Sequence, residues 1–89
     1  MSNLVRKNQL QRLAKIAEII GTRAVTKAMI LRKLYDAFNH EFSQSQIEKD
    51  IFCLRMDFDA PIVCDRSTKL YYFNENYDFR EALLNYFGL

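Results

Sequence analysis

Residues 43–55, SQSQIEKDIFCLR, decide the fold of this chain. Ser43 is followed three residues later by Gln46, a spacing typical of a capping box at the start of a helix. Polar residues occupy one side near the amino end of this stretch. Apolar residues recur at helical spacing on the other side, namely Ile47, Ile51, Leu54 and Phe58. The pattern therefore predicts a helix that packs with one face and presents the other.

Two short β-rich segments follow this helix. The helix is expected to end near Pro61, because proline disfavours the α region for the residue before it. The β-rich segments are residues 62–64 and 70–73, and the polar residues 65–69 between them predict a hairpin tip. A helix with a polar amino end followed by a hairpin with a basic tip is the layout of a winged helix, in which the helix can enter a major groove. We therefore predict an α+β winged helix-turn-helix with three helices, a small antiparallel sheet and a short carboxy-terminal helix.

Residues 43–79 resemble the amino-terminal DNA-binding domain of WYL-domain transcriptional regulators. The matching motifs follow the family's order: Ser43, Ile47, Asp50-Ile51, Leu54-Arg55, Ala60-Pro61-Ile62, Tyr71-Tyr72-Phe73 and Tyr77-Asp78-Phe79. The sequence departs from the family at residues 44–46, where the family has basic residues and Thr, and at Asp59, where it has Gly. The resemblance implies a DNA-binding domain of a transcriptional regulator.

The composition suits one small globular domain, because the 89 residues are 49% hydrophobic and include only two Gly and one Pro. The sequence has no predicted membrane span or signal peptide, so we expect a cytoplasmic protein. Cys53 and Cys64 lack metal-ligand spacing and are expected to be reduced thiols in the core. We assign residues 1–75 to the DNA-binding domain and residues 76–89 to a carboxy-terminal segment.

Basic residues concentrate in the first third of the chain, although the formal net charge is only +2. Only Glu18 opposes them before Asp36. The cations there are Arg6, Lys7, Arg12, Lys15, Arg23, Lys27, Arg32 and Lys33. We expect the amino-terminal helices to contact a polyanion, with help from Lys49 and the hairpin tip. The alternative is a basic face that is merely solvated.

Two further helices are predicted before residue 43. The first covers about residues 7–20 and ends at Gly21, a natural helix stop. Residues 24–25 are expected to add a short third strand to the hairpin. Thr26 is the predicted cap of the second helix, and Phe42 is expected to fill the corner between the second and third helices.

A closing helix is predicted to begin after Asp78, its candidate cap. Phe52 and Met56 fall opposite the apolar stripe of the 43–55 helix, so a further element should cover them, and the closing helix is a candidate. Its apolar residues are Phe79, Leu83, Tyr86 and Phe87. We expect this helix either to pack on its own domain or to form a homodimer contact.

The predicted DNA contacts come from the third helix, the hairpin tip and the first two helices. Gln44 and Ser45 are candidates for base edges, since Gln can form two hydrogen bonds with adenine, while Lys49 is expected beside a phosphate. The hairpin tip would hold the backbone or the minor groove. The candidate DNA-binding residues are Gln44, Ser45, Gln46, Lys49, Lys27, Arg66, Lys69 and Arg12.

Catalytic, metal and cofactor sites are not predicted. Gly21 and Gly88 cannot form a phosphate-binding loop, and the lone His40 lacks ligand partners nearby. Asp57 and Asp59 at a helix end are expected to be solvated. We therefore expect a protein without enzyme activity that binds double-stranded DNA, as a homodimer, in transcription regulation.

A second function stays open from the sequence: a winged helix that binds protein instead of DNA. Three features favour it, namely the uncharged residues 44–46, the acidic second half of the chain and the apolar Phe52. The target sequence and the direction of regulation do not follow from the residues.

Overall fold

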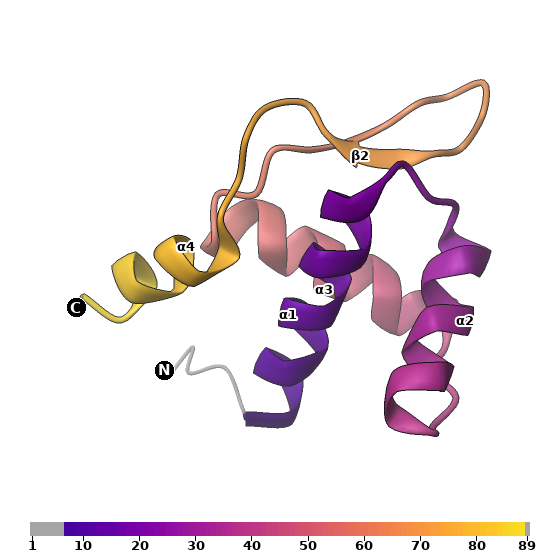
Figure 1. The fold of residues 1–89 in the computed structure, drawn as a ribbon, viewed down its shortest axis with the longest axis horizontal. Helices are drawn as coiled ribbons and strands as arrows, with labels where there is room; N and C mark the ends of the chain where they lie inside the picture. The colour runs from indigo at the N-terminus through magenta and orange to yellow at the C-terminus, as the bar shows by residue number, and fades with distance from the viewer. Residues whose placement is uncertain (1–6, 89) are drawn as a thin grey trace.

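The computed structural model describes residues 7–88, which form four helices and one two-stranded antiparallel sheet. The elements are α1 (Lys7–Thr22), α2 (Lys27–Phe38), α3 (Gln44–Asp57), β1 (Ile62–Cys64), β2 (Tyr71–Phe73) and α4 (Phe79–Tyr86). In Figure 1, α1 passes in front of α3, α2 stands beside α1, the hairpin runs above them and α4 lies at the far side from α2. The predicted α+β class is confirmed, and the order of elements is consistent with a winged-helix layout.

One apolar core lies between α1, α2, α3 and the sheet. The predicted stripe of α3 is confirmed, because Ile47, Ile51, Leu54 and Phe58 are all buried. Other core side chains are Leu13, Ile16, Ile20, Val25, Ile30, Leu34 and Ile62. Removal of this apolar surface from water is the main force that holds the three helices against the hairpin.

The predicted helix caps are confirmed. The Ser43 hydroxyl accepts a hydrogen bond from the Gln46 backbone N–H at 3.1 Å, and the Gln46 side chain accepts one from the Ser43 N–H at 3.2 Å. Thr26 caps α2 by accepting from the Met29 N–H at 3.2 Å. Asp78 caps α4. These bonds satisfy amide groups that a helix leaves unpaired at its start.

The predicted end of the first helix at Gly21 is wrong, because α1 continues to Thr22. A glycine stop requires a left-handed backbone, and Gly21 does not have a positive φ. Its missing side chain instead suits the close approach of Phe73, since a Cβ atom on Gly21 would lie 3.4 Å from that ring. The predicted third strand is reduced to one bridge, in which Val25 and Tyr71 exchange two backbone hydrogen bonds of 3.0 and 2.7 Å.

The closing helix α4 packs on the carboxy-terminal end of α3. The Phe58 ring lies 5.3 Å from the Phe79 ring and 4.6 Å from the Tyr86 ring, measured between centroids. The expectation that this segment covers Phe52 and Met56 is wrong, because their side chains are 61% and 63% exposed. Phe58 faces the inner side of α3, whereas Phe52 and Met56 lie on its outer side, so one short helix cannot reach both.

Candidate nucleic-acid interface

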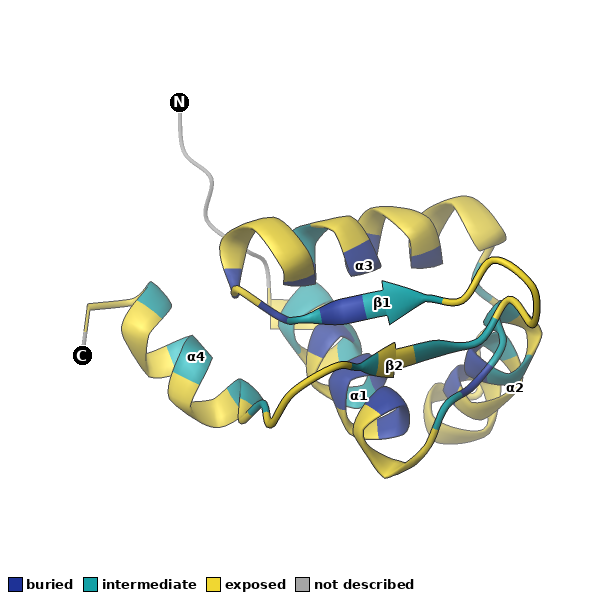
Figure 2. Cartoon of the chain, turned by 90° about the horizontal axis from the view of Figure 1, so that it is seen from above, coloured by how far each residue is buried: buried dark blue, intermediate teal, exposed yellow. Residues whose placement is uncertain are grey.

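The outer ridge of α3 consists of Ser45, Lys49, Phe52 and Met56, which are all exposed. Its residues recur at three- and four-residue spacing, so they share one side of the helix. The opposite side is buried against the core, and Figure 2 shows the exposed side of α3 turned away from the sheet and from α1. Lys49 lies at the middle of the ridge, so its side chain is on the same side of α3 as that of Ser45 and not on a flank of the helix.

The amino end of α3 offers two side chains for recognition. Gln44 and Ser45 are exposed, and neither side chain forms a hydrogen bond with residues 7–88. The third candidate, Gln46, is already engaged, because its side-chain oxygen accepts the Ser43 N–H in the capping box. Base reading by Gln46 would therefore break a cap, whereas Gln44 and Ser45 are available at no such cost.

The hairpin tip is held by Asp65. Its carboxylate accepts hydrogen bonds from the backbone N–H groups of Ser67 at 2.7 Å and Thr68 at 3.1 Å. The bonds from Thr68 and Ser67 lower the pKa of Asp65, because they favour its charged form. Arg66 and Lys69 are exposed at this ordered tip and form no ion pair within the described part of the chain.

Lys27 connects the start of α2 to α3. Its ammonium forms an ion pair with Glu48, and this hydrogen bond raises the pKa of Lys27. Glu48 therefore neutralises the charge of Lys27, which is one of the candidate DNA-binding residues. Lys27 is still more than a quarter exposed along its side chain, at 26%, so it can also reach a phosphate at the edge of α3.

Arg12 is held by a core carboxylate, although it lines an open hollow together with Gln46. Its guanidinium binds the carboxylate of Asp50 through two N–H groups, one of them at 3.1 Å, and lies 5.4 Å above the centre of the Phe42 ring. Asp50 is 1% exposed, the only buried charged residue among 7–88. Arg12, a candidate DNA contact from the sequence, instead neutralises a carboxylate in the core.

Arg32 and Tyr35 of α2 were absent from the candidates but lie beside the amino end of α3. Both are exposed, and they line an open hollow together with Phe42 and Ser43. The sequence does place Arg32 on the polar face of its helix. Which helix that face adjoins depends on how α2 and α3 cross, and the spacing of residues in α2 alone does not determine it.

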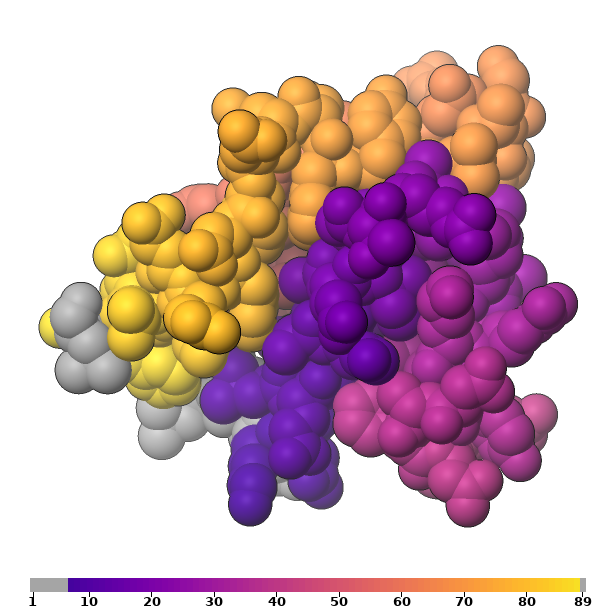
Figure 3. All heavy atoms as spheres, viewed as in Figure 1, coloured from indigo at the N-terminus to yellow at the C-terminus, as the bar shows by residue number. Residues whose placement is uncertain are grey.

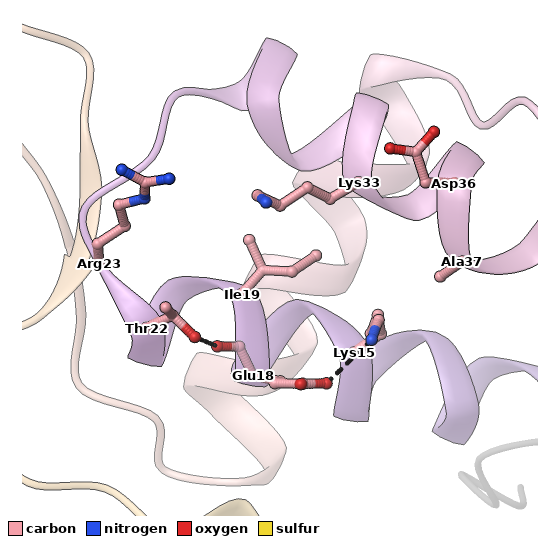
Figure 4. A pocket seen from close by; sticks show the side chains of 8 residues that line it. All are labelled: Lys15, Glu18, Ile19, Thr22, Arg23, Lys33, Asp36 and Ala37. Carbon is pink, nitrogen blue, oxygen red and sulfur yellow. Dashed lines mark hydrogen bonds and ion pairs between the residues drawn. The ribbon is translucent and has the colours of Figure 1, made fainter.

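The remaining cations of the first two helices lie on another face. Lys15, Arg23 and Lys33 line an open groove of about 340 Å³ between α1 and α2, with Ile19 at its floor (Figure 4). Lys15 pairs with Glu18 at 3.1 Å. Figure 3 shows the face formed by α1 and α2, which is opposite to the outer ridge of α3 in Figure 2. Lys15, Arg23 and Lys33 therefore lie apart from Lys49 on the outer ridge, whereas Lys27 and Arg32 of the basic first third adjoin α3.

Residues 7–88 hold no candidate metal site. They contain no group of three or more His, Cys, Asp or Glu side chains that could hold a metal ion. Cys53 and Cys64 are free thiols, but both are half-buried and not in the core as expected. Burial, with a smaller effect of the nearby Asp57, raises the pKa of Cys53 to about 12, which keeps this thiol protonated and unreactive near neutral pH.

Comparisons of the chain with protein-family models, with curated proteins and with solved structures gave no match. Within the described range, no helix has the length and apolar character needed to span a bilayer.

Proposed function

We propose that this chain binds duplex DNA as a winged helix-turn-helix domain of a transcriptional regulator. One observation carries the proposal: the amino end of α3 presents unengaged polar side chains, Gln44 and Ser45, on an exposed helix beside a hairpin with unpaired cations. The sequence resemblance to WYL-domain regulators supports the same assignment. A single helix of this kind matches the width of a major groove, about 12 Å.

In this proposal Gln44 and Ser45 read base edges. Gln44 would form two hydrogen bonds with adenine, and Lys49, at the middle of the outer ridge, would meet guanine or a nearby phosphate. Lys27 and Arg32 would hold the backbone on the α2 side, and Arg66 and Lys69 on the hairpin side. The neutral amino end implies that base contacts depend on hydrogen bonds more than on charge.

A homodimer is part of the proposal, since regulators of this kind bind paired half-sites. Its support is that α4 leaves Leu84 and Phe87 exposed, at 46% and 43%, after its other face has packed on Phe58. These two side chains are available to a second copy.

The test compares Gln44→Ala with Gln11→Ala, a matched change of an exposed glutamine on α1. We expect Gln44→Ala to weaken binding to a preferred duplex by about 1–3 kcal/mol and to relax preference at one base pair. Gln11→Ala should leave both unchanged. Affinity and preference are measured by competition between the preferred duplex and a random duplex. Equal preference for all three proteins would remove α3 as the reading helix.

The second candidate function is a winged helix that binds a protein partner. The exposed apolar side chains of Phe52 and Met56 favour it, because large exposed apolar groups on a helix often mark a partner surface. Duplex binding that does not change with salt concentration would support this alternative.

A further inference from the structure

Phe52 is exposed on the face that the proposed function turns towards DNA. Its side chain is 61% exposed and has no ring contact within residues 7–88. It follows Lys49 on the outer ridge of α3 by one turn. The ring packs little against the core and is therefore available to a partner that offers an apolar group.

Helix geometry brings Phe52 within reach of the same groove as Ser45. A helix rises about 1.5 Å per residue, so the seven residues from Ser45 to Phe52 span about 10 Å along the axis. The major groove is about 12 Å wide, whereas Met56 lies about 16 Å from Ser45 and falls beyond that width. In a helix that enters the groove by its amino end and crosses it, Ser45 and Phe52 therefore both lie within that width, and Met56 does not.

The major groove presents one apolar group to such a ring. Each thymine carries a methyl group at C5, while every other feature of the base edges there is a hydrogen-bond donor or acceptor. On the basis of the proposed function, we infer that Phe52 contacts the C5-methyl group of a thymine and is a specificity-determining residue of this chain. Phe52 lies one turn from Lys49, and this favours DNA over an apolar protein surface as the partner. DNA offers anionic phosphates to the lysine and, close by, a methyl group to the ring.

The experiment removes the methyl group alone. Short duplexes that the wild-type chain selects from a random library are remade with each thymine replaced in turn by deoxyuridine. We expect one replacement to weaken wild-type binding about fourfold, the effect of about one buried methyl group. The ratio of affinities for the thymine duplex and the uracil duplex should fall to about one for Phe52→Ala. For Phe52→Leu this ratio should keep part of its wild-type value.

Met56→Ala is the matched control, because it removes an equally exposed apolar side chain of the same ridge. It should retain the wild-type ratio. A wild-type chain that selects duplexes but tolerates every uracil overturns the inference and leaves the proposed function standing. A Phe52→Ala chain that keeps the wild-type ratio also overturns it. If the wild-type chain selects no duplex and binds none in a salt-dependent way, the proposed function fails, and this inference fails with it.

Discussion

Arg12 and Asp50 form an internal ion pair that ties α1 to α3. The side chains are 17% and 2% exposed, so the carboxylate depends on this one arginine for its neutralisation. A buried pair adds little net stability as a whole, but the loss of one partner leaves an unpaired charge in the core. Arg12 is therefore a residue of the fold, although its charge type suggested a phosphate contact.

The stability of single variants checks this role. Arg12→Ala should lower the free energy of unfolding by about 3–5 kcal/mol, because Asp50 is then buried without a partner. Lys15→Ala, which breaks the exposed pair with Glu18 on the same helix, should cost less than about 1 kcal/mol. Urea unfolding measures both. If Arg12→Ala lowers the free energy of unfolding no more than Lys15→Ala does, the Arg12–Asp50 pair is not essential to the fold.

The Arg12–Asp50 pair could not be predicted from the sequence. The two residues are 38 positions apart, and the periodicity of α1 places Arg12 off the apolar stripe, where it was expected to reach solvent or phosphate. Whether such a position faces solvent or another helix depends on the crossing of α1 and α3. The same limit applies to Arg32, whose neighbours become clear only when α2 and α3 are seen together.

At the scale of elements, local signals were sufficient for the helix starts. Ser43, Thr26 and Asp78 each cap the predicted helix, because a cap involves only residues two or three positions away. The buried stripe of α3 followed from spacing for the same reason. The end of α1 did not follow from Gly21, and the sequence left open whether α4 packs on its own domain or on a second copy, because that packing depends on the distant Phe58.

The packing of α4 predicts unequal effects of two substitutions on that helix. Tyr86→Ala should lower the free energy of unfolding by about 2 kcal/mol, because its ring packs against Phe58. Leu84→Ala, at an exposed position, should cost less than about 0.5 kcal/mol. Chemical denaturation measures both changes. Similar costs for the two variants would mean that α4 is not anchored through Tyr86.

The same helix allows a test of the proposed homodimer without loss of the fold. The double variant Leu84→Ala/Phe87→Ala removes the exposed apolar side chains of α4 and leaves its contacts with Phe58 in place. A dimer formed through this surface should sediment as a monomer after the change. A wild-type chain that is already monomeric at high concentration would exclude the dimer.

For the whole molecule, the distribution of charge over two faces is the main departure from the sequence-based expectation. Lys15, Arg23 and Lys33 surround the α1–α2 groove, whereas Lys49, Arg66 and Lys69 belong to the outer ridge of α3 and the hairpin tip. Composition reveals how many cations the first third contains, but not where they point. The proposed function uses the second set, together with Lys27 and Arg32 beside α3, and does not use the first set.

Two triple variants with equal charge loss separate these faces. For the wild-type chain we expect a slope of log affinity against log salt of about −3 to −6. Lys49→Gln/Arg66→Gln/Lys69→Gln should flatten this slope by about two to three units, because up to three fewer counterions are released. Lys15→Gln/Arg23→Gln/Lys33→Gln should change it by less than about one unit, since salt screens charges on the far face. The reverse order would mean that DNA lies on the α1–α2 face.

The hollow between the end of α3 and α4 has a consequence for how quickly a complex forms. It is lined by four carboxylates, those of Asp57, Asp59, Asp78 and Glu81. In Figure 1 the hairpin tip and α4 lie at opposite ends of the molecule, so the two signs of charge give the chain an electric dipole. In the field of a polyanion this dipole would orient the chain with the hairpin tip towards the polyanion and α4 away from it. If the chain binds DNA as proposed, the acidic end should therefore affect the rate of productive encounters more than the lifetime of the bound complex.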